Sequence, residues 1–224
     1  MVAWNGVSWK RVKSANVGSR SNFLQAVTAA SRTSLWAAGY YFNGHQEQTL
    51  IEHWTGHSWA ITPSPNVGGG ATTNGLYGIA AVSSTSAWAV GYHEPGQTLI
   101  EHWNGRTWKL VTSPNPGPVS DFLNGVAAAS PSSVWAVGFD VTGPTGGRRG
   151  QTLVEHWNGH SWNRVKSPNV MGSNNNSLWA VAATGTTAWA VGIYVDDTAA
   201  KFPYQTLTAR WTGHAWHFVP SPDR

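Results

Sequence analysis

The residues best suited to chemistry are three Glu-His pairs, Glu52-His53, Glu101-His102 and Glu155-His156, each followed directly by Trp. A carboxylate beside an imidazole is a combination used in general acid–base catalysis. Successive side chains of an extended strand point to opposite faces, however, so the two members of each pair diverge and cannot act together. An active site also normally occurs once. We therefore expect these pairs to be structural, hydrogen-bonding one part of the molecule to the next.

The phrase around each pair belongs to a long internal repeat. "QTLIEHW" or a close variant begins at Gln48, Gln97 and Gln151, and a looser copy at Gln205 has Ala209 and Arg210 in place of Glu and His. A second word, "WAVG" or "WAAG", begins at Trp36, Trp88, Trp135 and Trp189. The period is roughly 50 residues, which is typical of stacked or circular repeat architectures.

Each repeat unit is predicted to contain four short strands, called a to d in chain order. In the second unit they cover residues 76–83, 87–93, 98–104 and 107–113, which are rich in small, β-branched and aromatic residues. Gly, Pro, Asn and Ser separate them, and no segment shows a helical period of useful length. Four strands per unit of this length indicate a β-propeller, an all-β fold in which each unit is one blade.

The repeated words "WAVG" and "EHWNGxSW" resemble those of Trp-rich bacterial repeat proteins, which are similar to kelch, WD-repeat and lectin-like propellers. The resemblance covers almost the whole chain and implies the propeller fold. It also implies an extracellular location as part of a longer bacterial protein, although it brings no settled function with it.

The blade count is uneven. We expect one domain with complete blades at residues 21–70, 71–119, 120–173 and 174–224, preceded by an isolated c–d pair at 1–20. A half blade leaves bare strand edges, which proteins avoid exposing. Three resolutions are open. The half blade could be completed by a partner chain in a homodimer, it could be a reduced fifth blade, or the array could continue in a longer protein.

A W-x-G-x-x-W word marks each c–d turn. Asn5-Gly6, Asn104-Gly105 and Asn158-Gly159 predict tight hairpins in which both residues adopt positive φ. The flanking Trp pairs are expected to clamp these hairpins, with sugar stacking as the alternative. His57, His160 and His214 lie within the turns and are expected to be solvated, since Arg106 replaces His in one copy.

Composition excludes several classes of protein. The 224 residues include 15 Trp, no Cys and a net charge of +4 without a basic run. The absence of Cys rules out disulfides and thiolate metal sites, and the scattered charge predicts no nucleic-acid partner. No apolar stretch could span a membrane, no signal peptide is recognisable, and no His spacing indicates a zinc site. We expect no cofactor and no metal.

Variation in loop length predicts where a ligand binds. The c–d turn keeps one length, whereas the b–c loop varies, as in Trp88 to Thr98 against Trp189 to Thr206. Because strands alternate in direction, the b–c and d–a loops share one end of the molecule, where binding loops on a rigid scaffold usually lie. The predicted ligand-binding residues on this end are Tyr41, His45, Tyr92, His93, Glu94, Arg148, Arg149, Tyr194, Asp196, Asp197 and Tyr204.

The function that these observations favour is a ligand-binding propeller, with a carbohydrate or other small molecule as its ligand. A protein-interaction scaffold and an enzyme with its site at the channel mouth are the alternatives. A glycosidase would need a unique carboxylate pair, and only the adjacent Asp196 and Asp197 and isolated acids such as Glu94 and Asp140 stand out. We therefore assign no catalytic residue.

Overall fold

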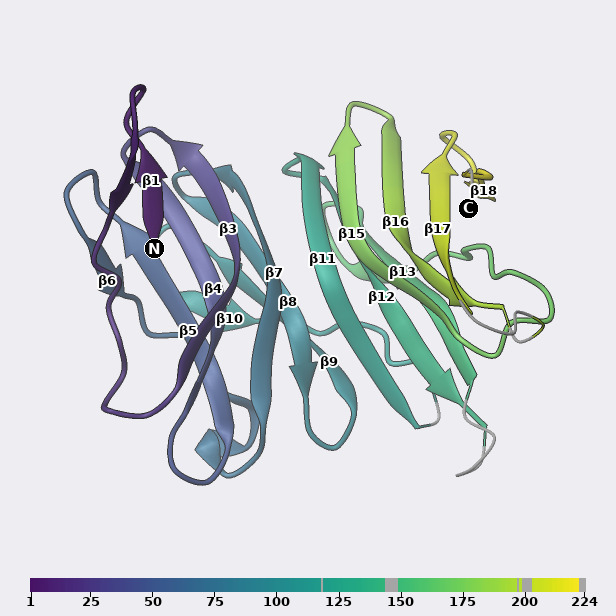
Figure 1. The fold of residues 1–224 in the computed structure, drawn as a ribbon, viewed down its shortest axis with the longest axis horizontal. Coiled ribbons are helices and arrows are strands. Elements are labelled where there is room, and N and C mark those ends of the chain that lie inside the picture. Colours follow the sequence, from purple (N-terminus) through teal and green to yellow (C-terminus); the bar gives the residue numbers. More distant parts are fainter. Residues whose placement is uncertain (118, 144–148, 197, 199–202, 222–224) are drawn as a thin grey trace.

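The computed structural model describes residues 1–117, 119–143, 149–196, 198 and 203–221. It contains a two-stranded sheet followed by four four-stranded antiparallel sheets, each a simple meander in chain order (Figure 1). The predicted all-β propeller-type fold, with four complete blades and an N-terminal half blade, is confirmed. In the described part of the chain, no helix has the length and apolarity needed to span a membrane.

The half blade consists of β1 (Val2–Trp4) and β2 (Trp9–Arg11). The strands of the four blades are as follows: β3 (Asn22–Ser31), β4 (Ser34–Phe42), β5 (Glu47–Trp54) and β6 (Trp59–Ile61); β7 (Asn74–Ser83), β8 (Ser86–His93), β9 (Gln97–Trp103) and β10 (Trp108–Leu110); β11 (Ser120–Ser130), β12 (Ser133–Thr142), β13 (Arg149–Trp157) and β14 (Trp162–Arg164); β15 (Asn176–Thr184), β16 (Thr187–Val195), β17 (Tyr204–Trp211) and β18 (Trp216–Phe218). A short 3₁₀ segment, Val67–Gly70, precedes β7.

The blades pack face to face, and their first strands, β3, β7, β11 and β15, lie side by side along the inner edge of the array. Small residues allow this approach. A Cβ on Gly125 of β11 would lie 2.9 Å from the carbonyl oxygen of Trp179 and 3.0 Å from the Cα of Ala180, both in β15. The inner strands are therefore close enough for backbone and side chains of neighbouring blades to interlock.

The glycine of the "WAVG" word has a steric explanation. At Gly39, Gly91, Gly138 and Gly192, a Cβ would overlap a carbonyl oxygen of the neighbouring first strand, from Phe23, Gly75, Phe122 and Ser177 respectively. In each blade the partner strand has a β-bulge next to this position. The glycine thus accommodates the bulge, and its recurrence reflects backbone geometry.

A cluster of three Trp side chains holds each blade to the next. Trp36 of the first blade lies 4.9 Å from Trp103 and 5.2 Å from Trp108 of the second, measured between ring centroids. Equivalent clusters form around Trp88 and Trp135 with the hairpin Trp pairs of the third and fourth blades. Trp36, Trp88 and Trp135 are only 1–3% exposed, so the recurring Trp residues form the hydrophobic contact between blades.

The "SPN" words fasten the connection between blades to strand c. Thr152 Oγ1 lies 2.7 Å from Ser167 Oγ, and the Thr152 N–H donates to Asn169 Oδ1 at 2.8 Å. Thr49 and Thr98 make the same contacts with Ser and Asn of their own SPN words. These side chains satisfy the polar backbone of the linker where it leaves the sheet.

The predicted role of the Glu-His pairs, bonding one blade to the next, is confirmed for Glu52, which accepts hydrogen bonds from Ser14 and Ala15 of the linker that leaves the half blade. It needs correction for His102 and Glu101. His102 hydrogen-bonds Ser86 Oγ at 3.0 Å and packs on Trp88 with ring centroids 4.2 Å apart, so it binds its own blade instead of bridging to the next. Glu101 does face the neighbouring blade, but its carboxylate is buried and has no hydrogen-bond partner within the described residues. Burial raises the pKa of Glu101 well above its ordinary value.

The turn prediction is also wrong in one respect. Gly6, Gly105 and Gly159 have positive φ, but no described non-Gly residue does. The preceding Asn instead accepts hydrogen bonds, as Asn104 Oδ1 does from the N–H groups of Arg106 and Thr107, both at 3.0 Å. These are four-residue loops between paired Trp residues, capped by an Asn side chain.

The His102 contacts predict a stability effect. His102→Ala removes a half-buried ring from Trp88 and a hydrogen bond from Ser86, which should cost about 1–3 kcal/mol of unfolding free energy. Lys109→Ala is the matched control, since Lys109 pairs with His102 across the strands but is exposed, and it should unfold like the native chain. Denaturant unfolding measures both; equal midpoints for the two variants would contradict the assignment.

Candidate ligand-binding site

Four side chains at the inner edge of the array break the repeat. Each first strand carries a β-bulge at the same point, and the inserted residue is Gln25, Tyr77, Asn124 or Trp179. β-bulges redirect side chains and are common beside functional sites. Almost every structural residue recurs between blades, whereas these four positions carry four different residues. A singular ligand site is therefore best sought along this inner edge.

Tyr77 lies at the centre of a row of aromatic rings that crosses three blades. Tyr77 and Tyr40 have ring centroids 6.2 Å apart, and Tyr92 stacks on Phe122 of the next blade at 4.5 Å. Phe23 and Phe139 extend the row at its two ends. All of these rings come from the first or second strand of a blade, near the end that carries the b–c loops, and each is at least partly exposed.

Two carboxylates share the environment of these tyrosines. Burial raises the pKa of Tyr77 to about 12, and the charge of Glu47 adds to the effect. Burial likewise raises the pKa of Tyr92, with contributions from Glu94 and Glu47. The pKa of Glu47 is itself raised by burial and by Glu94. We call Tyr40, Glu47, Tyr77, Tyr92 and Glu94 the axial cluster. It offers phenol O–H donors next to carboxylate acceptors.

The cluster is held by contacts between blades. Glu94 Oε2 accepts a hydrogen bond from the Thr73 N–H at 3.2 Å, and Thr73 Oγ1 donates to Gln46 Oε1 at 2.7 Å. His93 is buried, with its Nδ1 2.8 Å from the carbonyl oxygen of Glu94. His93 also lines a hollow with Val67, Gln97 and Thr98, and its predicted contact with ligand stays a prediction.

Tyr92 and Glu94 are the predicted residues that join the axial cluster, and the others lie apart from it. Tyr41 faces the linker at 17–20, and His45 lies in a turn capped by Asn43 Oδ1. Arg149 begins β13, Tyr194 is in β16, and Tyr204 begins β17 and is exposed. Hydrogen bonds from Thr198 lower the pKa of Asp196. Arg148 and Asp197 lie outside the described residues.

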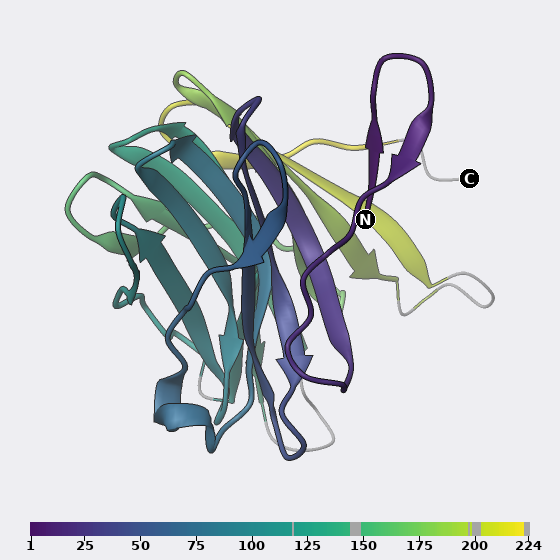
Figure 2. The same cartoon turned by 90° about the vertical axis from the view of Figure 1, so that its left-hand side faces the viewer.

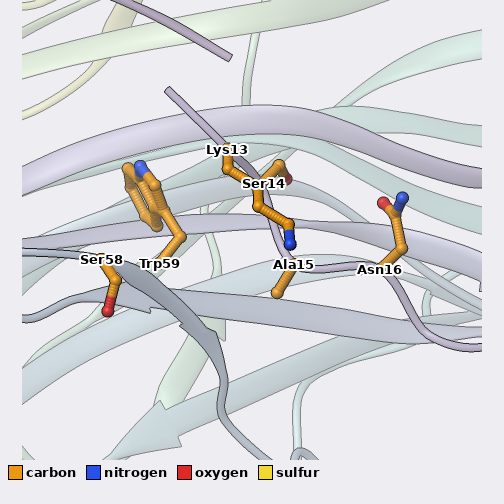
Figure 3. A pocket seen from close by; sticks show the side chains of 6 residues that line it. All are labelled: Lys13, Ser14, Ala15, Asn16, Ser58 and Trp59. Carbon is orange, nitrogen blue, oxygen red and sulfur yellow. The ribbon is translucent and has the colours of Figure 1, made fainter. Parts of the chain in front are cut away.

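A second kind of surface repeats with the blades. One groove lies between the linker residues Lys13–Asn16 and Trp59 of the first blade (Figure 3). Another lies between Lys166 with its neighbours and Trp216 of the fourth blade. The two grooves occupy equivalent positions beside W-x-G-x-x-W hairpins. They combine an aromatic wall with a Lys ammonium, so they are the candidates for repeated binding pockets.

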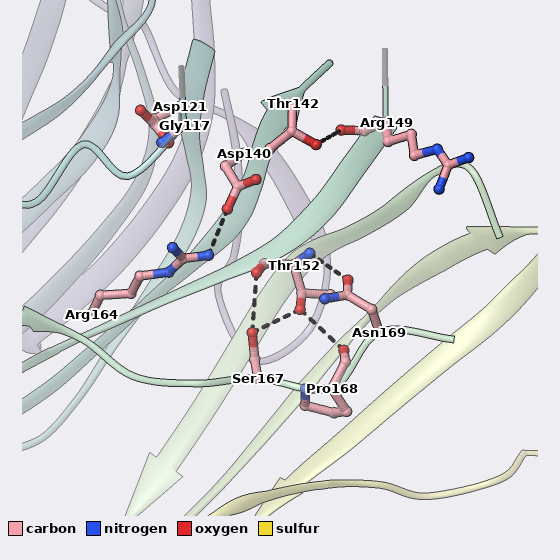
Figure 4. A network of polar contacts seen from close by, with 10 residues as sticks. All are labelled: Gly117, Asp121, Asp140, Thr142, Arg149, Thr152, Arg164, Ser167, Pro168 and Asn169. Atoms are coloured by element: carbon pink, nitrogen blue, oxygen red, sulfur yellow. Dashed lines mark hydrogen bonds and ion pairs between the residues drawn. The ribbon is translucent and has the colours of Figure 1, made fainter. Parts of the chain in front are cut away.

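Besides Glu47 and Glu94, the described residues include a second pair of neighbouring carboxylates that occurs in one blade only, and this pair is internal. Asp121 and Asp140 face each other across β11 and β12, both 1% exposed, and Arg164 Nη2 bonds Asp140 Oδ2 at 2.9 Å (Figure 4). The Gly117 N–H donates to Asp121 Oδ1 at 2.9 Å. Burial at the contact with the second blade keeps both carboxylates from a substrate, so this network links strands and does not form a glycosidase pair.

Sequence reasoning missed Glu47, Tyr77 and the Asp121–Arg164 network. Tyr77 occupies a bulge, and a bulge inserts one residue without an obvious sequence signal. Comparing equivalent positions could have found the network, because Asp121 replaces the Asn of the other three blades and Arg164 replaces Ile, Leu or Phe. A residue that breaks a repeat at a structural position marks a local change of partner.

No protein-family model and no curated protein matches the chain. Solved structures do match. An ulvan lyase, described as a polysaccharide lyase bound to GlcA(1-4)Rha3S, is 11% identical with a TM-score of 0.55, over 97% of this chain and 65% of its own. A structure of YCF48 bound to D1 peptide is 11% identical with a TM-score of 0.51, over 93% of this chain and 60% of its own. Both are β-propeller proteins, and at this identity the likeness shows the fold alone. The chain spans less than two thirds of either.

The carboxylate network predicts a pH-dependent stability. Burial raises the pKa of Asp121 to about 6, with Asp140 adding to the shift and Gly117 and Arg164 opposing it. The folded state therefore holds this proton more tightly than the unfolded chain, and the stability present at acid pH is lost as the pH rises through about 6. Asp121→Asn keeps the Gly117 hydrogen bond, as Asn74 and Asn176 do at equivalent positions.

We expect the melting temperature of Asp121→Asn to exceed that of the native chain at pH 7 and to approach it near pH 4. Comparing the two chains at each pH cancels the titration of Glu101, which is common to both. Glu155 does not cancel, because the charge of Asp121 also raises its pKa, and removing that charge stabilises the variant at pH 7 in the same direction. A variant that is less stable than the native chain at pH 7 would contradict the raised pKa.

Proposed function

We propose that this chain is a carbohydrate-binding β-propeller module and that the axial cluster is its binding site. The observation that carries the proposal is a row of partly exposed rings at the inner edge, with the non-repeated Tyr77 in it and two carboxylates beside it. Aromatic faces pack against the apolar faces of sugar rings, while a few placed polar groups fix orientation. Tyr77 stays protonated at neutral pH because its pKa is about 12, and so it donates a hydrogen bond to a sugar hydroxyl.

The charge of the cluster narrows the class of sugar. Glu47 and Glu94 accept hydrogen bonds from hydroxyl or ammonium groups, but they repel carboxylates and sulfates at close range. The proposed ligand is therefore a neutral or amino sugar. Arg149, Asp196 and Tyr204, at or next to the ends of β13, β16 and β17 that carry the b–c loops, form the proposed outer rim.

A glycan array tests the proposal directly. The native chain should bind neutral or amino sugars, and Tyr77→Ala should weaken that binding at least about tenfold, because a buried stacking ring contributes 1.4 kcal/mol or more. Tyr77→Phe keeps the ring and removes only the donor, so its affinity should fall between the two. Melting curves exclude misfolding as the cause.

The controls separate the two candidate surfaces. Trp59→Ala changes the groove of the first blade and leaves the axial cluster intact, so sugar binding should persist. If Trp59→Ala abolishes binding while Tyr77→Ala does not, the repeated grooves are the site. If no sugar binds, and a peptide library yields a ligand sensitive to Tyr77, the protein-interaction alternative replaces the carbohydrate proposal.

A further inference from the structure

Among the described residues, nothing covers the face of the fourth blade in the way that the face of each other blade is covered. Trp36, Trp88 and Trp135 are each capped by two Trp rings of the following blade, whereas the equivalent Trp189 is 41% exposed. Val191, two residues along the strand, is 47% exposed, while Val90 and Val137 at the same position are fully buried. Three copies of this contact within one molecule define what fits such a face: a c–d hairpin bearing a Trp pair.

The residue beside Trp189 is Arg210, which differs from the His at the equivalent position of the other three blades. The guanidinium of Arg210 lies 5.5 Å from the centroid of the Trp189 ring, at the position where the other blades have a half-buried His packed on the equivalent Trp. Arg can stack on an aromatic face while its charge stays in water. The uncovered face therefore has a hydrated charge next to Trp189 and still presents a large aromatic surface.

An unused Trp-pair hairpin lies at the other end of the molecule. The β1–β2 hairpin carries Trp4 and Trp9 with ring centroids 5.8 Å apart, and these rings are 54% and 65% exposed. Figure 2 shows it projecting from the first blade. Val2 is 65% exposed and stands where the complete blades have Glu or Ala. A lone two-stranded hairpin is at best marginally stable in water, so it needs a surface to pack against.

The Trp pair of the first blade is not an equal candidate. Trp59 lies beside the linker residues Lys13–Asn16 (Figure 3). Glu52, on the same sheet, is buried beneath that linker and accepts hydrogen bonds from Ser14 Oγ at 2.8 Å and the Ala15 N–H at 3.1 Å. The β1–β2 hairpin is therefore the open Trp pair that matches the open face.

We propose that the β1–β2 hairpin of one copy caps the Trp189 face of a second copy, so that chains associate head to tail. Trp4 and Trp9 would take the places that Trp211 and Trp216 hold on Trp135. The hairpin and the fourth blade lie at opposite ends of the long axis (Figure 1), which favours a second copy over the chain's own hairpin. Contacts of this heterologous kind close into a ring or grow into a filament.

Mass measurement over a wide range of protein concentration tests the proposal. The native chain should form dimers or larger species. Trp189→Ala and the double variant Trp4→Ala/Trp9→Ala should each raise the dissociation constant at least about thirtyfold, the loss typical of a central Trp in an interface. Trp179→Ala is the matched control, because Trp179 is 56% exposed in the same blade but lies on the inner edge. It should associate like the native chain.

Mixing the variants tests the polarity of the contact. Trp189→Ala retains an intact hairpin, and Trp4→Ala/Trp9→Ala retains an intact fourth-blade face, so each alone should be monomeric while the mixture forms a one-to-one complex. A symmetric interface would not be rescued in this way. Melting curves of the variants that match the curve of the native chain show that the variants fold.

Three outcomes would overturn the proposal. The native chain could stay monomeric at every concentration, as it would if its own hairpin or nothing caps the face. Trp179→Ala could disrupt association as strongly as Trp189→Ala. The two variants could each associate normally when measured alone, which would assign the contact to other residues.

Discussion

The whole array depends on one contact, the capping of a strand-b Trp by the hairpin Trp pair of the next blade. The central Trp of each cluster is only 1–3% exposed, and the centroid distances agree between clusters to within about 0.1 Å. The aligned rings fix the angle between successive sheets, and that angle brings the first strands together at the inner edge. The axial cluster and the bulges exist only because this outer contact places those edges side by side.

The polar groups around that apolar contact differ in whether they have hydrogen-bond partners. The His of strand c is held within its blade by Ser and Trp, and the linker is held by Thr, Ser and Asn. Glu101 and Glu155, in contrast, are buried without a partner among the described residues, and the fourth blade has Ala209 at this position. Burial raises the pKa of both Glu side chains, so ionising either of them within a contact between blades costs stability.

The repeat made the blade architecture predictable, because strand words, turn residues and loop lengths all recur with one period. The loop-bearing end that holds Tyr92 and Glu94 was predictable for the same reason. Tyr77 and Glu47 were not, since a bulge and the closeness of two blades are tertiary features that no local pattern encodes. The roles of the Glu-His pairs were predictable only in part: alternation along the strand correctly separated the two side chains, and Glu52 does bond the neighbouring unit, but alternation could not show which surface each side chain meets.

Because every pair of successive blades uses the same Trp contact, whole blades can be gained or lost during evolution. Every junction joins the rear of one unit to the front of the next through the same side chains, so adding or deleting one whole unit leaves each remaining junction intact. Unequal exchange between near-identical gene segments would therefore produce proteins with different numbers of blades that still fold. The inner-edge residues that differ between blades distinguish one blade from another. A change in blade number would alter their order and spacing without altering the scaffold that presents them.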